Sequence, residues 1–412
     1  MIKDLLSLFI IVGISLIAAK SYKFRLLLLS YLLFMFFIHP NVFTLTTFGG
    51  HPRLPIALLL FITGILEIRR TFDRLFYARI AVPVLLWFFY TVFSTVVVYE
   101  VNQYNIVYEQ IGDFLVFLLV ASYVSTSKYK ELVLILLSIA LALTINLIAF
   151  LPKVSSLFSF IPMYGYYHHG GAGLSGFKLI PILLFMYNRN HIKTTKAAYL
   201  ALILFASLMT FLSGSRTAMI GTICVLILYK RSIKWLTILV LMGLIAYYLS
   251  INYTDPTWGA ERVERVYLAF AEGRPTSIEE VDFRISHLEI GFNALREQPI
   301  LGYGFGSWDY VRGQAYGILD SKLGAHSSYA LIMSETGILG MILFSMMIYF
   351  CIRNTAFMAS NNYQKDLQYN ISLLILACLL LGINSTIFWN RQFTIFLGIA
   401  AGAKLRLKYN TR

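Results

Sequence analysis

The 412-residue chain is 58% hydrophobic and only 13% charged, whereas soluble domains carry about 25% charged residues. Apolar stretches of roughly 15 to 25 residues alternate with short polar clusters, which is typical of polytopic helical membrane proteins. The period-two alternation of a membrane β-barrel is absent, so the predicted fold class is all-α, a bundle of transmembrane helices. The three cysteines lie in apolar stretches without a CxxC pair, which argues against a disulfide framework or a zinc site.

The net charge of +14 follows the membrane topology and does not indicate a nucleic-acid partner. Eleven of the twenty acidic residues lie between Asp255 and Asp320. The basic residues gather instead in short clusters between apolar stretches: Lys20, Lys23, Arg25; Arg69, Arg70, Arg74, Arg79; Lys128, Lys130; Arg189, Lys193, Lys196; Lys230, Arg231, Lys234; Lys404, Arg406, Lys408, Arg412. Because cytoplasmic loops are enriched in Lys and Arg, these clusters predict the cytoplasmic side.

The apolar stretches predict 12–13 transmembrane helices. The first stretch lacks a small-residue cleavage site before the next basic cluster, so we expect a retained helix. The predicted helices are 5–19, 26–38, 54–68, 80–98, 111–125, 132–151, 174–187, 197–212, 216–229, 235–251, 328–352, 370–388 and 392–404. With a cytoplasmic C-terminus, thirteen helices place the N-terminus outside and twelve place it in the cytoplasm, and both remain open.

The predicted organisation is transmembrane helices over 1–251, a large external loop with short helices over 252–325, and C-terminal transmembrane helices over 326–412. Within the loop, WGAERVERVYLAFAEG (258–273) has the spacing of an interfacial helix. DFRISHLEIGFNAL (282–295) predicts a second helix with one apolar face: Ile285, Leu288, Phe292 and Leu295. A polar loop of this length, with helices of its own, usually carries function.

Two arginines are candidates for an anion site on the external side. In SGSR (213–216), Ser215 is a plausible N-cap that places Arg216 in the first turn of the next helix. A cation opposes the helix dipole there, which makes sense if the free N–H groups and the guanidinium bind a phosphate. Asp282 would place Arg284 in the same way. The alternatives are a snorkelling arginine for Arg216 and a solvated surface arginine for Arg284.

His326 precedes the apolar stretch 328–352 and is the candidate general base, because its imidazole accepts a proton near neutral pH. The alternative is a histidine that only hydrogen-bonds at a helix start. Glu335 lies about 13 Å further along that helix and is predicted to be a buried structural or gating carboxylate. No carboxylate or cysteine near His168 and His169 completes a metal site, so no metal is expected.

These stretches together resemble the bacterial O-antigen ligase and O-antigen polymerase superfamily of polytopic glycosyltransferases. The resemblance covers the second half of the chain and is carried by SGSR (213–216), FRISHLEIGFNALREQPILGYGFGSW (283–308) and AHSSYALIMSETGILG (325–340). It implies that Arg216 and Arg284 bind the substrate diphosphate and that His326 is catalytic. Ser213, Ser215 and Glu335 would be supporting residues.

The resemblance implies a donor glycan on a polyprenyl (undecaprenyl) diphosphate carrier and transfer at the periplasmic face of the bacterial inner membrane. It implies an inverting reaction without a metal or another cofactor. The acceptor would be lipid A-core for a ligase of lipopolysaccharide biosynthesis, or a second glycan for a polymerase. Loop size and chain length favour the ligase slightly. A polysaccharide or lipid transporter is the alternative of another class, which would carry charges near the bilayer midplane and show repeat symmetry.

Overall fold

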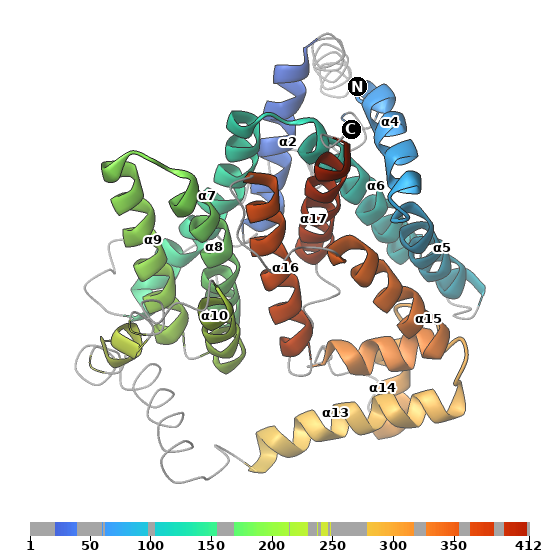
Figure 1. Cartoon of the computed structure of the whole chain (residues 1–412). Helices are drawn as coiled ribbons and strands as arrows, with labels where there is room; N and C mark the ends of the chain where they lie inside the picture. The colour runs from blue at the N-terminus through green and yellow to red at the C-terminus, as the bar shows by residue number, and fades with distance from the viewer. Residues whose placement is uncertain are drawn as a thin grey trace, which may run out of the picture.

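The computed structural model describes residues 21–38, 60, 62–97, 104–154, 169–213, 215–229, 237, 240–245, 248, 278–316, 327–353, 363–382 and 391–409. In this part of the chain every regular element longer than one turn is a helix (Figure 1). The helices are α2 (Tyr22–Phe37), α4 (Ile65–Tyr77), α5 (Ala81–Val97), α6 (Tyr104–Thr126), α7 (Tyr129–Val154), α8 (His169–Arg189), α9 (Lys193–Leu212), α10 (Arg216–Leu228), α13 (Ile278–Glu297), α14 (Trp308–Tyr316), α15 (Ser328–Ile352), α16 (Tyr363–Leu381) and α17 (Arg391–Tyr409). The predicted all-α fold class is confirmed.

Four described helices are long and apolar enough to cross a membrane. They are formed by Ile106–Thr126, Tyr129–Pro152, Lys193–Leu212 and Ser328–Ile352, in α6, α7, α9 and α15. The α4–α5 pair makes a fifth candidate that is bent by 107°. The fold is therefore a polytopic helical membrane bundle. The count of 12–13 stays a prediction, because 5–19 and most of 235–251 lie outside the described residues.

The α4 region differs from the prediction of a helix at 54–68 followed by a basic loop. Three of the arginines predicted in that loop lie on α4 itself, which buries Ile68, Thr71 and Leu75 along one face. This spacing of three and four residues leaves Arg69 and Arg70 exposed on the other face, as in an amphipathic interfacial helix. The basic cluster therefore lies on a helix, although its charge had predicted a loop after residue 68.

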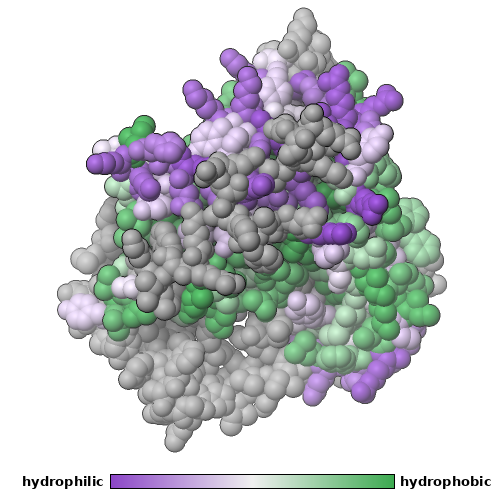
Figure 2. All heavy atoms as spheres, viewed as in Figure 1, coloured by the Kyte–Doolittle hydropathy of each residue, from purple (hydrophilic) through white to green (hydrophobic). Residues whose placement is uncertain are grey.

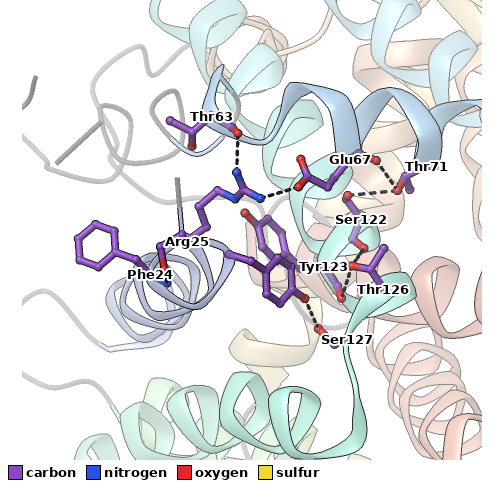
Figure 3. Close-up of polar contacts among 11 residues, drawn as sticks. Phe24, Arg25, Thr63, Glu67, Thr71, Ser122, Tyr123, Thr126 and Ser127 are labelled. Carbon is purple, nitrogen blue, oxygen red and sulfur yellow. Dashed lines mark hydrogen bonds and ion pairs between the residues drawn. The ribbon is translucent and has the colours of Figure 1, made fainter. Parts of the chain in front are cut away.

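Arg25, also predicted in a basic loop, lies in α2 and is buried in a polar cluster (Figure 3). Its guanidinium donates to the Thr63 carbonyl at 2.9 Å and pairs with the Glu67 carboxylate at 2.5 Å. One turn after Glu67 in α4, the Thr71 hydroxyl donates to the Ser122 hydroxyl of α6 at 3.1 Å. A buried guanidinium needs such partners, so this cluster fixes α2 and α6 against α4.

The two ends of the bundle differ. The start of α2 and the end of α17 lie at one end, while α13 and α14 lie across the other end (Figure 1). Figure 2 shows hydrophilic residues gathered over the end that holds the start of α2 and the end of α17, next to a broad hydrophobic belt. This distribution agrees with the prediction that the basic clusters and the C-terminal end of α17 lie on the cytoplasmic side.

Candidate functional site

The turn between α9 and α10 is formed by the predicted SGSR motif. Ser213 caps the C-terminus of α9, and its hydroxyl donates to the Thr210 carbonyl at 2.7 Å. Ser215 is the N-cap of α10, and its hydroxyl accepts from the Ala218 N–H at 3.4 Å. A Cβ on Gly173 of α8 would lie 2.5 Å from the Ser213 Oγ, so α8 packs closely on this turn. The predicted N-cap is confirmed, and both serines help to build the turn.

Arg216 is the first residue of α10, as predicted. Its backbone is described and its side chain lies outside the described part of the structure. The first N–H groups of a helix lack partners within the helix, so this terminus combines free donors with a cationic residue. Its role in binding a diphosphate stays a prediction.

The predicted start of α13 is wrong. The helix begins at Ile278, four residues before Asp282, so Asp282 does not cap it and Arg284 is not in the first turn. The dipole of α13 therefore gives no reason to expect an anion beside Arg284, because the effect of the dipole fades within the first turn. The side chain of Arg284 lies outside the described residues.

The predicted apolar face of α13 is correct at Leu288, which packs against a buried cluster that includes Ile290 and Ala294, and wrong at Phe292. The buried residues are His287, Ile290 and Ala294, whereas Phe292 is 54% exposed. A Cβ on Gly291 would lie 2.8 Å from the Cα of Ala330 in α15, so small residues bring the two backbones together. Helices in membrane proteins often pack through small residues and leave bulky apolar ones outside, which reverses the pattern expected for a soluble domain.

His326 lies outside the described residues, which resume at Ser327. Ser327 caps α15 by accepting from the Ala330 N–H at 3.3 Å. The Ser328 N–H donates to the Gly382 carbonyl at the end of α16, at 2.8 Å. The start of α15 is thus tied to α16 at the end of the bundle that carries α13 and α14 (Figure 1).

The segment after α13 clasps a break in α15. Gly337 interrupts α15 with φ 59° and ψ −165°, so its neighbours lose their regular helical hydrogen bonds. The segment 299–304 replaces them with four backbone bonds: Tyr303 N to Ser334 O at 2.8 Å, Gly304 N to Glu335 O at 3.0 Å, Ile338 N to Pro299 O at 2.9 Å, and Leu339 N to Ile300 O at 3.2 Å. Broken helices persist in membranes only where the freed groups find such partners. The segment 299–304 is therefore part of the α15 structure.

Glu335 is buried, as predicted, and 1% exposed. One of its carboxylate oxygens accepts from the Trp308 N–H at 3.1 Å. Trp308 is the first residue of α14, where an anion is favourable because the N–H groups are free and the helix dipole is positive. This contact gives the predicted structural role a physical basis: Glu335 holds α14 on α15.

Tyr303 is a poor candidate for a base in this region. Its hydroxyl donates to the Glu297 carboxylate. This hydrogen bond and partial burial raise the pKa of Tyr303 to about 12, so the phenol stays protonated at neutral pH. Tyr303 is therefore not the general base, and His326 stays the predicted one.

A cavity of about 390 Å³ lies between α5, α6, α15 and α17. Asp113 of α6 and Arg391 of α17 form an ion pair in its wall. Glu335 lines another side, together with Phe305, which directly follows the segment 299–304. The cavity thus connects the clasped part of α15 with charged residues in the interior of the bundle.

The sequence analysis missed Asp113, Arg391 and His287. A signal existed for Asp113, because a carboxylate in an otherwise apolar transmembrane stretch is a functional candidate by default. Arg391 directly precedes a predicted helix and resembled a loop residue. His287 is fully buried against the edge of Trp308, with ring centroids 5.4 Å apart, and only the tertiary structure reveals that contact.

The comparisons with known proteins concern the same segments. A family model described as O-antigen ligase matches residues 200–345. That range includes the SGSR turn, α13, the clasp and most of α15. No curated protein sequence matches the chain.

Proposed function

We propose that this chain, whose residues 200–345 match the O-antigen ligase family model, is a membrane glycosyltransferase using a polyprenyl-diphosphate-linked glycan as donor. The family match carries this proposal, because it spans all three predicted site residues. The start of α10, α13 and the start of α15 all lie at the end of the bundle opposite the end of α17 (Figure 1). That end would face the periplasm, where the acceptor hydroxyl is presented.

The proposed reaction is a direct displacement at the anomeric carbon. His326 accepts the proton of the acceptor hydroxyl while its oxygen forms the new glycosidic bond. The bond between the anomeric carbon and the diphosphate oxygen breaks, and its electron pair leaves with the polyprenyl diphosphate. Arg216 and Arg284 offset the charge that develops on this leaving group. The displacement inverts the anomeric centre, and a leaving group this good needs no metal.

The proposed acceptor is lipid A-core, which makes the chain an O-antigen ligase of the bacterial inner membrane. The size of the 252–325 loop supports this choice over the polymerase, which adds glycan to glycan on the lipid carrier. A transporter remains a second candidate because of one observation, the Asp113–Arg391 pair inside the bundle. Transporters place such charges within the bilayer.

A reconstitution experiment tests the function. Purified protein in lipid vesicles receives a polyprenyl-diphosphate-linked glycan together with either lipid A-core or a second glycan-lipid. We expect transfer to lipid A-core, detected as a higher-mass glycolipid and released polyprenyl diphosphate. Extension of the glycan-lipid alone would favour the polymerase. Movement of the glycan-lipid across the vesicle without any transfer would favour the transporter and contradict the proposal.

Cysteine labelling tests the side of the membrane. Gln314 of α14 and Lys130 near the start of α7 are both exposed and belong to opposite ends of the bundle (Figure 1). In a chain without its native cysteines, we expect Gln314→Cys to react with an impermeant maleimide in intact spheroplasts. Lys130→Cys should react only after permeabilisation. Labelling of both positions from one side would contradict the topology and the periplasmic site.

A further inference from the structure

We propose that the cavity between α5, α6, α15 and α17 binds an uncharged, hydroxyl-rich sugar residue of a glycan substrate, an inference that rests on the proposed transferase function. The cavity volume is about 390 Å³, near the lower end of the ~300–1,000 Å³ typical of ligand pockets. That volume suits a small sugar unit and is too small for a whole glycan.

The apolar part of the cavity wall is aromatic. Trp87 of α5 lies 4.9 Å from Phe344 of α15 and 6.5 Å from Phe305, between ring centroids. Phe344 in turn lies 6.2 Å from Phe393 of α17. All four rings are buried, with 3–6% exposure. Their combined surface offers flat apolar faces on which the C–H face of a sugar ring can lie.

The polar part of the wall consists mainly of hydrogen-bond acceptors. The wall includes Glu109 and Gln110 on one turn of α6 and Asp113 on the next, with Arg391 and Glu335 from α17 and α15. Sugar hydroxyls donate hydrogen bonds to carboxylates and amides, and they accept from the amide and the guanidinium. A wall of aromatic faces with a few convergent polar groups is the usual form of a small-molecule site.

The charges of the wall exclude the other parts of the substrate. The wall has three carboxylates and one guanidinium, so a diphosphate would meet a net repulsion when these groups are ionised. A polyprenyl chain would displace water from this polar wall and offer no hydrogen bonds in its place, which is costly. An uncharged sugar ring avoids the charge repulsion, and its hydroxyls can still form hydrogen bonds with the polar wall.

The position of the cavity agrees with a glycan subsite. Lys404 of α17 donates to the Phe350 carbonyl near the C-terminal end of α15. Arg391 in the cavity wall lies thirteen residues earlier in α17, so about 20 Å of helix separates it from Lys404. On the other side, Glu335 lies about 12 Å of helix from Ser327 at the start of α15. A glycan that reacts beside His326 could therefore extend one of its other sugars into the cavity.

Two variants and two matched controls test the subsite. Gln110→Leu removes the amide at similar size, and Gln314→Leu makes the same exchange at an exposed residue of α14. Thr394→Phe fills the cavity, while Leu141→Phe adds a ring at a position of α7 that is 56% exposed. Two probes are used in nanodiscs: the free glycan released from its carrier by mild acid, and undecaprenyl diphosphate without sugar. Thermal unfolding of each variant reports whether it folds.

We expect Gln110→Leu to weaken binding of the free glycan about 5- to 10-fold, the effect of about one hydrogen bond. Thr394→Phe should abolish glycan binding, and binding of undecaprenyl diphosphate should be unchanged in every variant. In turnover, a raised KM for the acceptor with a nearly constant kcat assigns the sugar to the acceptor. A raised KM for the donor assigns it to the donor glycan.

Glycan binding and both KM values equal to those of the controls would overturn the subsite and leave the proposed function standing if wild-type turnover persists. Absence of turnover in the wild type would overturn the proposed function instead. Binding of the free glycan to the variants and controls still tests the subsite in that case, because binding does not depend on catalysis. If Thr394→Phe fails to fold, Gln110→Leu alone carries the test.

Discussion

Replacing His326 with alanine is expected to reduce glycan transfer by about 10²- to 10⁴-fold, the usual contribution of a general base, while donor binding survives. The expectation rests on the position of His326 directly before Ser327, which caps α15, and on the family match over 200–345. The diphosphate is held by other groups in the proposed site, so loss of the imidazole should act on kcat. A histidine that only hydrogen-bonds at the helix start would lower stability with little effect on turnover per folded molecule.

The measurement is a single-turnover rate with saturating donor, together with donor binding in nanodiscs. His191→Ala is the matched control, because His191 is exposed in the short turn between α8 and α9. His326→Gln keeps a hydrogen-bonding side chain without a group that titrates near neutral pH, so it should be as slow as alanine. Near-wild-type turnover in either His326 variant would show that the histidine has only a structural role.

Local signals predicted one part of the fold well. The end of α9 at Leu212, the start of α10 at Arg216 and the whole of α15 agree with the predicted bounds. Serines break or cap the helices at these points, and such capping depends on residues within one turn. The start of α16 was predicted seven residues late, because Gln364 and Asp366 resembled a loop. Both are buried, and Asp366 pairs with Arg189 at 2.8 Å, a partner 177 residues away that no local pattern contains.

The candidate site was predictable where its residues lie close in sequence to helix ends. Arg216 and Ser215 needed only the SGSR turn. The buried face of α13 was not predictable from periodicity, because Gly291 and Ala294 pack on α15 while Phe292 lies outside. The cavity draws on α5, α6, α15 and α17, and pairings such as Asp113 with Arg391 exist only in the assembled bundle.

Replacing either arginine of the proposed diphosphate site is expected to reduce glycan transfer strongly. Arg216→Ala and Arg284→Ala should each lower transfer by about 10- to 100-fold, the loss of charged hydrogen bonds worth about 1.5–3 kcal/mol. Lysine at either position should recover only part of this loss, because a guanidinium grips two phosphate oxygens and an ammonium offers a point charge. If charge alone were sufficient, the lysine variants would be nearly silent and low salt would rescue alanine.

The two positions differ in their helix context, and the controls use that difference. Arg216 is the first residue of α10, where the dipole disfavours a cation, so its replacement should not lower stability. Arg284 is the seventh residue of α13, so no dipole effect is expected there. Arg296, exposed in the last turn of α13, is the matched control, and Arg296→Ala should leave transfer unchanged. Equal losses at Arg284 and Arg296 would indicate a general charge effect of the helix.

A double-mutant cycle decides whether Arg216 and Arg284 hold the same group. Two residues that grip one diphosphate show a coupling energy of about 0.5–3 kcal/mol, because the second replacement acts on a substrate that is already misplaced. We therefore expect the combined alanine variant to lose less than the product of the two single losses. The cycle is measured on kcat/KM for the donor at constant ionic strength, since screening alters each single effect. Strictly multiplicative losses would show that the two arginines act on separate parts of the substrate.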